Sequence, residues 1–93
     1  MTQTLCAAVR GRQVVEFTYQ GRSRTAEPHI VGYDHEGEAL LSAWQLTGGS
    51  GRGFRSFRLS ELTGIRSTPA TFAAPRPGYN PRDPKFARVA CQL

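Results

Sequence analysis

The sequence predicts a small, mainly β protein: an antiparallel barrel with a short N-terminal helix and an extended, proline-rich C-terminal tail. Two observations predict this class. The stretch from Val14 to Ile65 divides into four or five short segments rich in β-branched and aromatic residues, separated by turns that contain glycine. Beyond Thr68 the periodicity stops and proline becomes frequent. We therefore assign residues 1–68 to the barrel domain and residues 69–93 to a tail that packs on the barrel or on a partner chain.

Each predicted element has a local cause. Thr4 can cap a short helix, Leu5, Ala8 and Val9 give that helix an apolar stripe, and Gly11 can end it. In the strand that follows the first turn, Pro28 cannot donate to a sheet and predicts an edge or a bulge. Glycines make residues 48–53 a flexible connection. The predicted elements are a helix at 4–12, strands at 13–19, 24–33, 39–46 and 54–59, a helical turn at 60–63, and short strands at 64–67 and 89–93.

Composition predicts one soluble domain. The chain has 93 residues, of which 39% are hydrophobic, which is sufficient for one thin core. No apolar run approaches the ~20 residues of a membrane span, and the first residues lack the layout of a signal peptide. We therefore expect a cytoplasmic protein without a membrane partner. Cys6 and Cys91 lack the spacing of metal ligands, and we expect them to be unpaired and buried, with a disulfide as the less favoured alternative.

A short helix, successive antiparallel strands and a helical turn before the last strand are typical of small SH3-like or Sm-like barrels. Four segments also resemble, in order and approximate spacing, the WYL domain: residues 15–21, 24–28, 37–44 and 55–62. The Trp-Tyr-Leu tripeptide of that family is here Ala39-Leu40-Leu41, and Glu61 stands where the family commonly has arginine. The resemblance implies a regulatory, ligand-sensing module that binds a nucleotide or single-stranded nucleic acid.

The candidate binding residues are mainly arginines. The net charge is +5, and eleven of the twelve basic residues are arginine, whose planar fork suits phosphate and carboxylate groups. The resemblance makes Arg55 and Arg58 the first candidates. Alternation along a strand places these two side chains on opposite faces. Trp44, His29 and Arg24 are second-rank contacts. The structural alternatives are solvated or ion-paired arginines, a packed tryptophan and a hydrogen-bonded histidine.

The function that we expect is therefore non-catalytic binding of an anionic ligand. The two histidines and seven acidic residues show no spacing that general acid–base catalysis would require. We expect no cofactor and no metal ion. The alternative function is that of a structural adaptor, which self-associates or docks to a partner protein through a barrel edge or through the tail. In that case Phe72, Tyr79 and Phe86 are the anchors of the tail.

Overall fold

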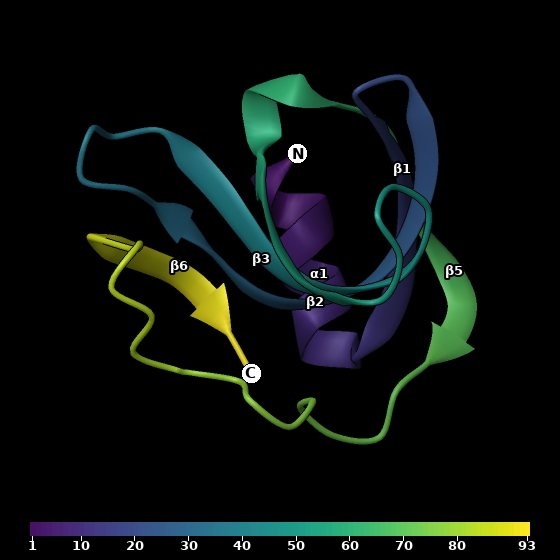
Figure 1. Cartoon of the computed structure of the whole chain (residues 1–93). Helices are drawn as coiled ribbons and strands as arrows, with labels where there is room; N and C mark the ends of the chain where they lie inside the picture. The colour runs from purple at the N-terminus through teal and green to yellow at the C-terminus, as the bar shows by residue number, and fades with distance from the viewer.

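The computed structural model describes all 93 residues and contains one helix, one 3-10 turn and six strands (Figure 1). The mainly β, antiparallel class that the sequence predicts is confirmed. No helix is both long enough and apolar enough to cross a membrane. The elements are α1 Thr2–Gly11, β1 Gln13–Tyr19, β2 Arg22–Tyr33, β3 Ala39–Thr47, β4 Gly53–Arg58, η1 Leu59–Glu61, β5 Leu62–Thr71 and β6 Arg88–Gln92.

The strands form one curved sheet in the order β4-β3-β2-β1-β5, and β6 pairs with β2. The first half of β2 pairs with β1 and its second half pairs with β6, so β2 holds both ends of the chain together. The hydrogen-bonded ladder does not close, because β4 and β5 are not paired with each other. Across this opening, Phe17 and Tyr19 of β1 each contact Phe57 of β4, with ring centroids 5.0 Å apart.

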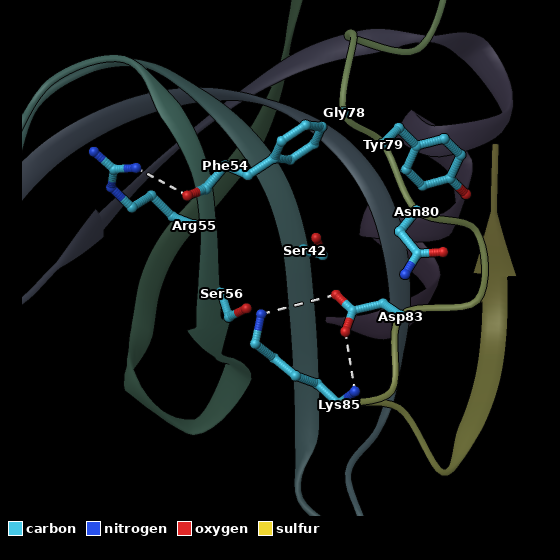
Figure 2. A pocket seen from close by; sticks show the side chains of 9 residues that line it. All are labelled: Ser42, Phe54, Arg55, Ser56, Gly78, Tyr79, Asn80, Asp83 and Lys85. Atoms are coloured by element: carbon cyan, nitrogen blue, oxygen red, sulfur yellow. Dashed lines mark hydrogen bonds and ion pairs between the residues drawn. The ribbon is translucent and has the colours of Figure 1, made fainter.

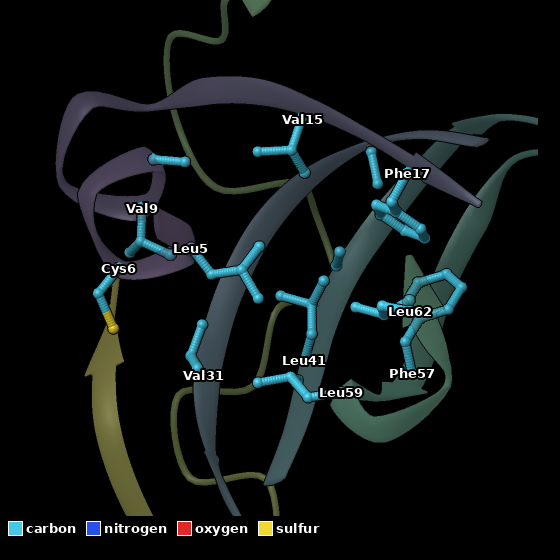
Figure 3. Packing of buried hydrophobic residues seen from close by; sticks show 13 residues of the cluster. Leu5, Cys6, Val9, Val15, Phe17, Val31, Leu41, Phe57, Leu59 and Leu62 are labelled. Atoms are coloured by element: carbon cyan, nitrogen blue, oxygen red, sulfur yellow. The ribbon is translucent and has the colours of Figure 1, made fainter. Parts of the chain in front are cut away.

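Helix α1 lies inside the curve of the sheet (Figure 1). Its buried residues join the inward-facing side chains of the strands in a core of 13 residues (Figure 3). Ten residues are too few for an isolated helix, so its stability comes from this burial. The predicted start of the helix was wrong: it begins at Thr2, with Met1 as the N-cap instead of Thr4. The helix ends at Gly11, the stop that the sequence offered, and the left-handed residue that follows it is Arg12 (φ 48°).

Three features of the strands were predicted from the local sequence. A register shift lies between Pro28 and Ile30, which confirms the predicted bulge. The final strand of the barrel segment is longer than predicted, because β5 continues along β1 until Thr71 pairs with Gln13. The predicted C-terminal strand is present as β6, one residue earlier than expected.

The prediction that the two cysteines are unpaired was wrong. Cys6 in α1 and Cys91 in β6 form a disulfide that joins positions 85 residues apart. Sequence spacing could not reveal this bond, since it depends on β6 returning to pair with β2 beside the helix. The bond ties the C-terminal strand to the N-terminal helix.

Residues 72–87, which we call the strap, connect β5 to β6 without regular structure (Figure 1). The strap is fixed at its start, where the Phe72 N–H donates to the Arg12 carbonyl (2.9 Å), and at its end, where the Ala87 N–H donates to the Tyr33 carbonyl (2.8 Å). Between these points it covers the outer face of β2. As a result β2 is buried on both faces from Ala26 to Gly32.

We predict that Cys6→Ser/Cys91→Ser lowers the free energy of unfolding by about 3 kcal/mol, because the bond closes a very long loop and so restricts the unfolded chain. Urea unfolding of the variant, and of the native protein with and without reductant, measures this. Two titratable thiols in the native, unreduced protein would contradict the disulfide.

Candidate functional site

A basic cavity of about 560 Å³ lies between the β1–β2 hairpin, the β3–β4 loop and β4. Three of its nine lining residues are arginines and none is acidic. The lining residues are Tyr19, Gln20, Arg22, Arg24, Gly49, Ser50, Arg55, Ser56 and Phe57. The cavity therefore carries a concentrated positive charge beside two aromatic rings.

Arg24 is the unusual member of this set, because it is only 7% exposed. Its guanidinium donates to the Gln45 side chain (3.0 Å) and to the Tyr19 carbonyl (3.3 Å), and it lies 5.1 Å from the centre of the Tyr19 ring. Its Nε has no hydrogen-bond partner. These neutral partners stabilise the cation only in part, since a buried charge is normally matched by an opposite charge.

None of the three cavity arginines is paired with a carboxylate. The four ion pairs of the chain join other residues. Arg55 is instead held by the loop before β4, where it donates to the Phe54 carbonyl (2.8 Å), to the Ser50 hydroxyl (3.0 Å) and to the Gly51 carbonyl (3.3 Å). The cavity thus contains guanidinium groups that are oriented but not neutralised.

The glycine-rich loop shapes one wall of the cavity. The amide of the fully buried Gln45 donates to the carbonyls of Gly48 (2.8 Å) and Gly51 (2.6 Å). Gly49 has a positive φ of 50°, and a Cβ on it would lie 2.6 Å from the Arg24 guanidinium. Glycine suits this position because of its positive φ and because the Arg24 guanidinium lies close to its backbone.

The five residues selected from the sequence do not form one site. Arg24 and Arg55 meet in the basic cavity. Arg58 points away from it, as strand alternation predicts, and forms an exposed pair with Glu38 (3.6 Å). Trp44 and His29 lie under the strap, on the outer face of the sheet. The structure thus separates the two arginines that the sequence ranked first.

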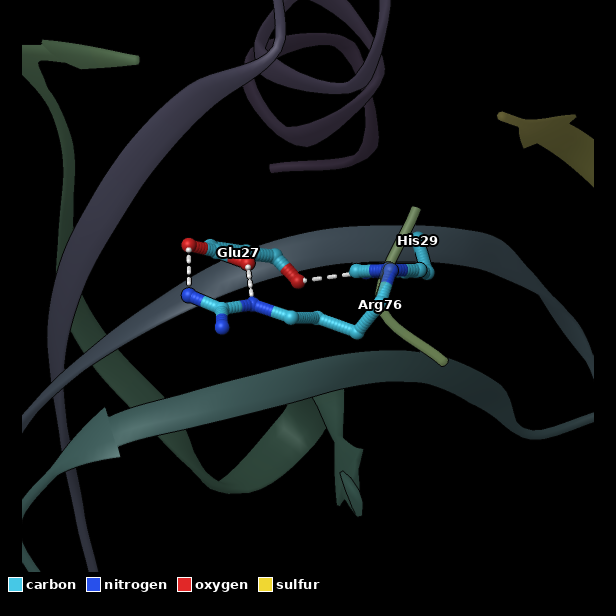
Figure 4. Close-up of polar contacts among 3 residues, drawn as sticks. All are labelled: Glu27, His29 and Arg76. Carbon is cyan, nitrogen blue, oxygen red and sulfur yellow. Dashed lines mark hydrogen bonds and ion pairs between the residues drawn. The ribbon is translucent and has the colours of Figure 1, made fainter. Parts of the chain in front are cut away.

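His29 and Glu27 bind the strap directly (Figure 4). The backbone N–H of Arg76 donates to His29 Nε2 (3.1 Å), while His29 Nδ1 lies 2.8 Å from the Glu27 carbonyl. A carbonyl only accepts, so Nδ1 carries the proton and the ring is neutral. The Arg76 guanidinium forms two bonds to the Glu27 carboxylate, at 2.7 and 2.9 Å, and lies over the Trp44 ring.

Burial and hydrogen bonds shift the pKa values of three groups in this outer cluster. Desolvation lowers the pKa of His29, an effect that the Glu27 carbonyl and carboxylate oppose and the Arg76 charge reinforces. The hydrogen bonds to Glu27 raise the pKa of Arg76, and burial raises the pKa of Tyr79. The rings of Phe54, Phe72 and Tyr79 enclose His29, with centroids 5.1–5.8 Å from its own. The histidine is therefore a structural contact of the strap.

Sequence reasoning missed Arg22 and Gln45. A signal for Gln45 was present: strand alternation places it on the same face as Leu41 and Ala43, where a polar residue needs a specific partner. Arg22 had no such signal, because it is the first residue of β2, directly after a turn, and its neighbours in space come from β4 and the β3–β4 loop.

In comparisons with known proteins, the chain matches no family model, no curated protein and no solved structure.

We predict that the protein loses stability as the pH falls below 6.5 because of His29. Its pKa is lower when folded than the unfolded value of 6.5, so the unfolded chain binds the proton first. The contribution is complete above pH 6.5 and is lost as the pH falls below it. Urea unfolding across this range measures the loss. His29→Gln should remove the dependence, whereas the control His35→Gln, at an exposed histidine, should keep it.

Proposed function

We propose that this chain is a non-catalytic binding module that holds an anionic ligand, a nucleotide or a segment of single-stranded nucleic acid, in the basic cavity. The observation that carries the proposal is the buried Arg24 guanidinium, which has no carboxylate partner and shares its cavity with Arg22 and Arg55. A bound phosphate would supply the missing negative charge, and arginine forks suit its geometry. Tyr19, which is only partly buried, offers ring surface beside the charge, which suits a base.

We also propose which type of barrel the fold represents. We regard the curved sheet as a variant of the SH3-like or Sm-like barrel and of the WYL domain, in which ring contacts of Phe57 stand where a closed barrel has hydrogen bonds. Its role would then be regulatory, with ligand binding as the signal. The cavity supports this description because it lies where β4 approaches the β1–β2 hairpin across the opening.

The proposal of a cytoplasmic location has its own test. Disulfides are rare in the reducing cytosol, whereas the chain has one between its helix and its last strand. Alkylation of free thiols at the moment of cell lysis shows whether the two cysteines are reduced inside the cell. Alkylated Cys6 and Cys91 would support the cytoplasm, and protected cysteines would contradict it.

Titration of a fluorescent single-stranded oligonucleotide at several salt concentrations tests the function. We predict that Arg55→Gln or Arg22→Gln weakens binding about tenfold or more, because each removes a charge-assisted contact. Arg58→Gln is the matched control: the same charge is removed outside the cavity, and it should have a much smaller effect. If all three cavity arginines contact phosphate, a plot of log K against log[salt] should have a slope of about −2.

Equal losses in Arg58→Gln and Arg55→Gln would contradict the cavity as the site. Absence of binding at low salt, both for the oligonucleotide and for nucleoside mono- and triphosphates, would contradict the function.

A second prediction separates binding from stability. Arg24→Met removes a buried charge that has no opposite charge, but it also leaves the buried Gln45 oxygen without its donor, so we expect the two effects largely to cancel and the stability of the free protein to change little. The same change should abolish oligonucleotide binding. Urea unfolding and the titration, done on one preparation, measure both. A large loss of stability would show that Arg24 is a structural residue and would remove the main support for the proposal.

The alternative function, a structural adaptor, has one observation in its favour. The outer edges of β4, β5 and β6 have no strand partner in the chain, and unpaired edges can pair with another chain. Measuring the mass in solution by light scattering distinguishes the two functions. A constitutive dimer without affinity for anions would favour the adaptor.

A further inference from the structure

A second cavity, of about 230 Å³, lies between the strap and the outer face of β3 and β4 (Figure 2). Its floor is formed by Ser42 and Ser56, which are opposite each other in the β3–β4 ladder. The rings of Phe54 and Tyr79 line one end, and Asp83 and Lys85 line the other. This cavity plays no part in the proposed binding of an anion, since the Arg55 guanidinium is turned away from it toward the Phe54 carbonyl.

The charges of this cavity differ from those of the basic cavity. Asp83 and Lys85 are opposite in sign, and their charged atoms Oδ2 and Nζ are 3.8 Å apart, beyond hydrogen-bond distance. Asp83 uses its other oxygen to accept the Lys85 backbone N–H (2.9 Å). Asp83 and Lys85 thus form an ion pair without a direct hydrogen bond, and the ammonium and the Oδ2 atom can each still form a hydrogen bond to a ligand.

The two serines on the floor of the cavity also favour ligand binding. Ser42 is a largely buried residue, 7% exposed, and its hydroxyl faces the cavity (Figure 2). A hydroxyl can both donate and accept, so it offers a hydrogen bond to a ligand that reaches the floor.

We propose that this cavity binds a free α-amino acid with an apolar or aromatic side chain. The two charges of an amino acid head group are close together, so its carboxylate can accept from Lys85 and Ser42 while its ammonium donates to Asp83. The side chain then lies against Phe54 and Tyr79. The volume is below that of pockets for drug-sized ligands and suits a molecule of this size.

Calorimetric titration of the full chain with L-phenylalanine tests the proposal. N-acetyl-L-phenylalanine lacks the ammonium and L-phenylalaninamide lacks the carboxylate. Each analogue should bind about tenfold more weakly or worse, because each loses a charged contact. Amide NMR shifts on adding L-phenylalanine should be concentrated in residues 78–85 and around Ser42. Equal binding of the three compounds, or no binding of L-phenylalanine at millimolar concentration, would overturn the proposal.

Two variants locate the site. Asp83→Asn keeps the acceptor for the Lys85 N–H but removes the charge, so it should abolish binding of L-phenylalanine. Arg22→Gln, in the basic cavity, should leave that binding unchanged. The reverse pattern would overturn the proposal. Oligonucleotide binding should respond to Arg22→Gln and not to Asp83→Asn, so the two proposed functions can fail separately.

Discussion

The contact between the strap and β2 is the constraint on which the rest of the structure depends. Glu27 and His29 are almost completely buried on the outer face of β2, where neither could remain without partners. Arg76 supplies both, through its guanidinium and its backbone N–H. Once the strap is held there, it returns the chain to β2 as β6 and places Cys91 beside Cys6. The strap thereby adds a second buried layer, on the outer face of β2, to the thin core on its inner face.

The same contact separates the two cavities. On the inner side of the opening, Arg22, Arg24 and Arg55 gather without acidic neighbours. On the outer side, the strap brings Asp83 and Lys85 over the serines of β3 and β4. Strand β4 lines both cavities, with Arg55 directed to one and Phe54 to the other. One short strand thereby contributes to a basic cavity and to a cavity of balanced charge, because its side chains alternate between the faces.

Stability and binding are in conflict at Arg24. Burial of an unmatched cation costs free energy, which neighbouring rings and the Gln45 amide offset only in part. The unmatched charge of Arg24 is the reason for the ligand that we propose in the basic cavity. Arg76, also placed against an aromatic ring, differs because Glu27 neutralises it. Comparing these two arginines is therefore more informative than counting the basic residues of the chain.

The sequence by itself determined the strands, most of the turns, the bulge at Pro28 and the opposite directions of Arg55 and Arg58, because local periodicity and backbone chemistry decide each of these. It also identified Arg24 and Arg55 as binding candidates. Only the tertiary structure decided that these two share a cavity, that Cys6 pairs with Cys91, and that His29 and Trp44 lie beneath the strap. The bond from the strap to His29 joins residues 47 positions apart, and the disulfide joins residues 85 positions apart. The physical reason is that a local pattern specifies which face a side chain occupies, whereas the path of the strap specifies what meets that face.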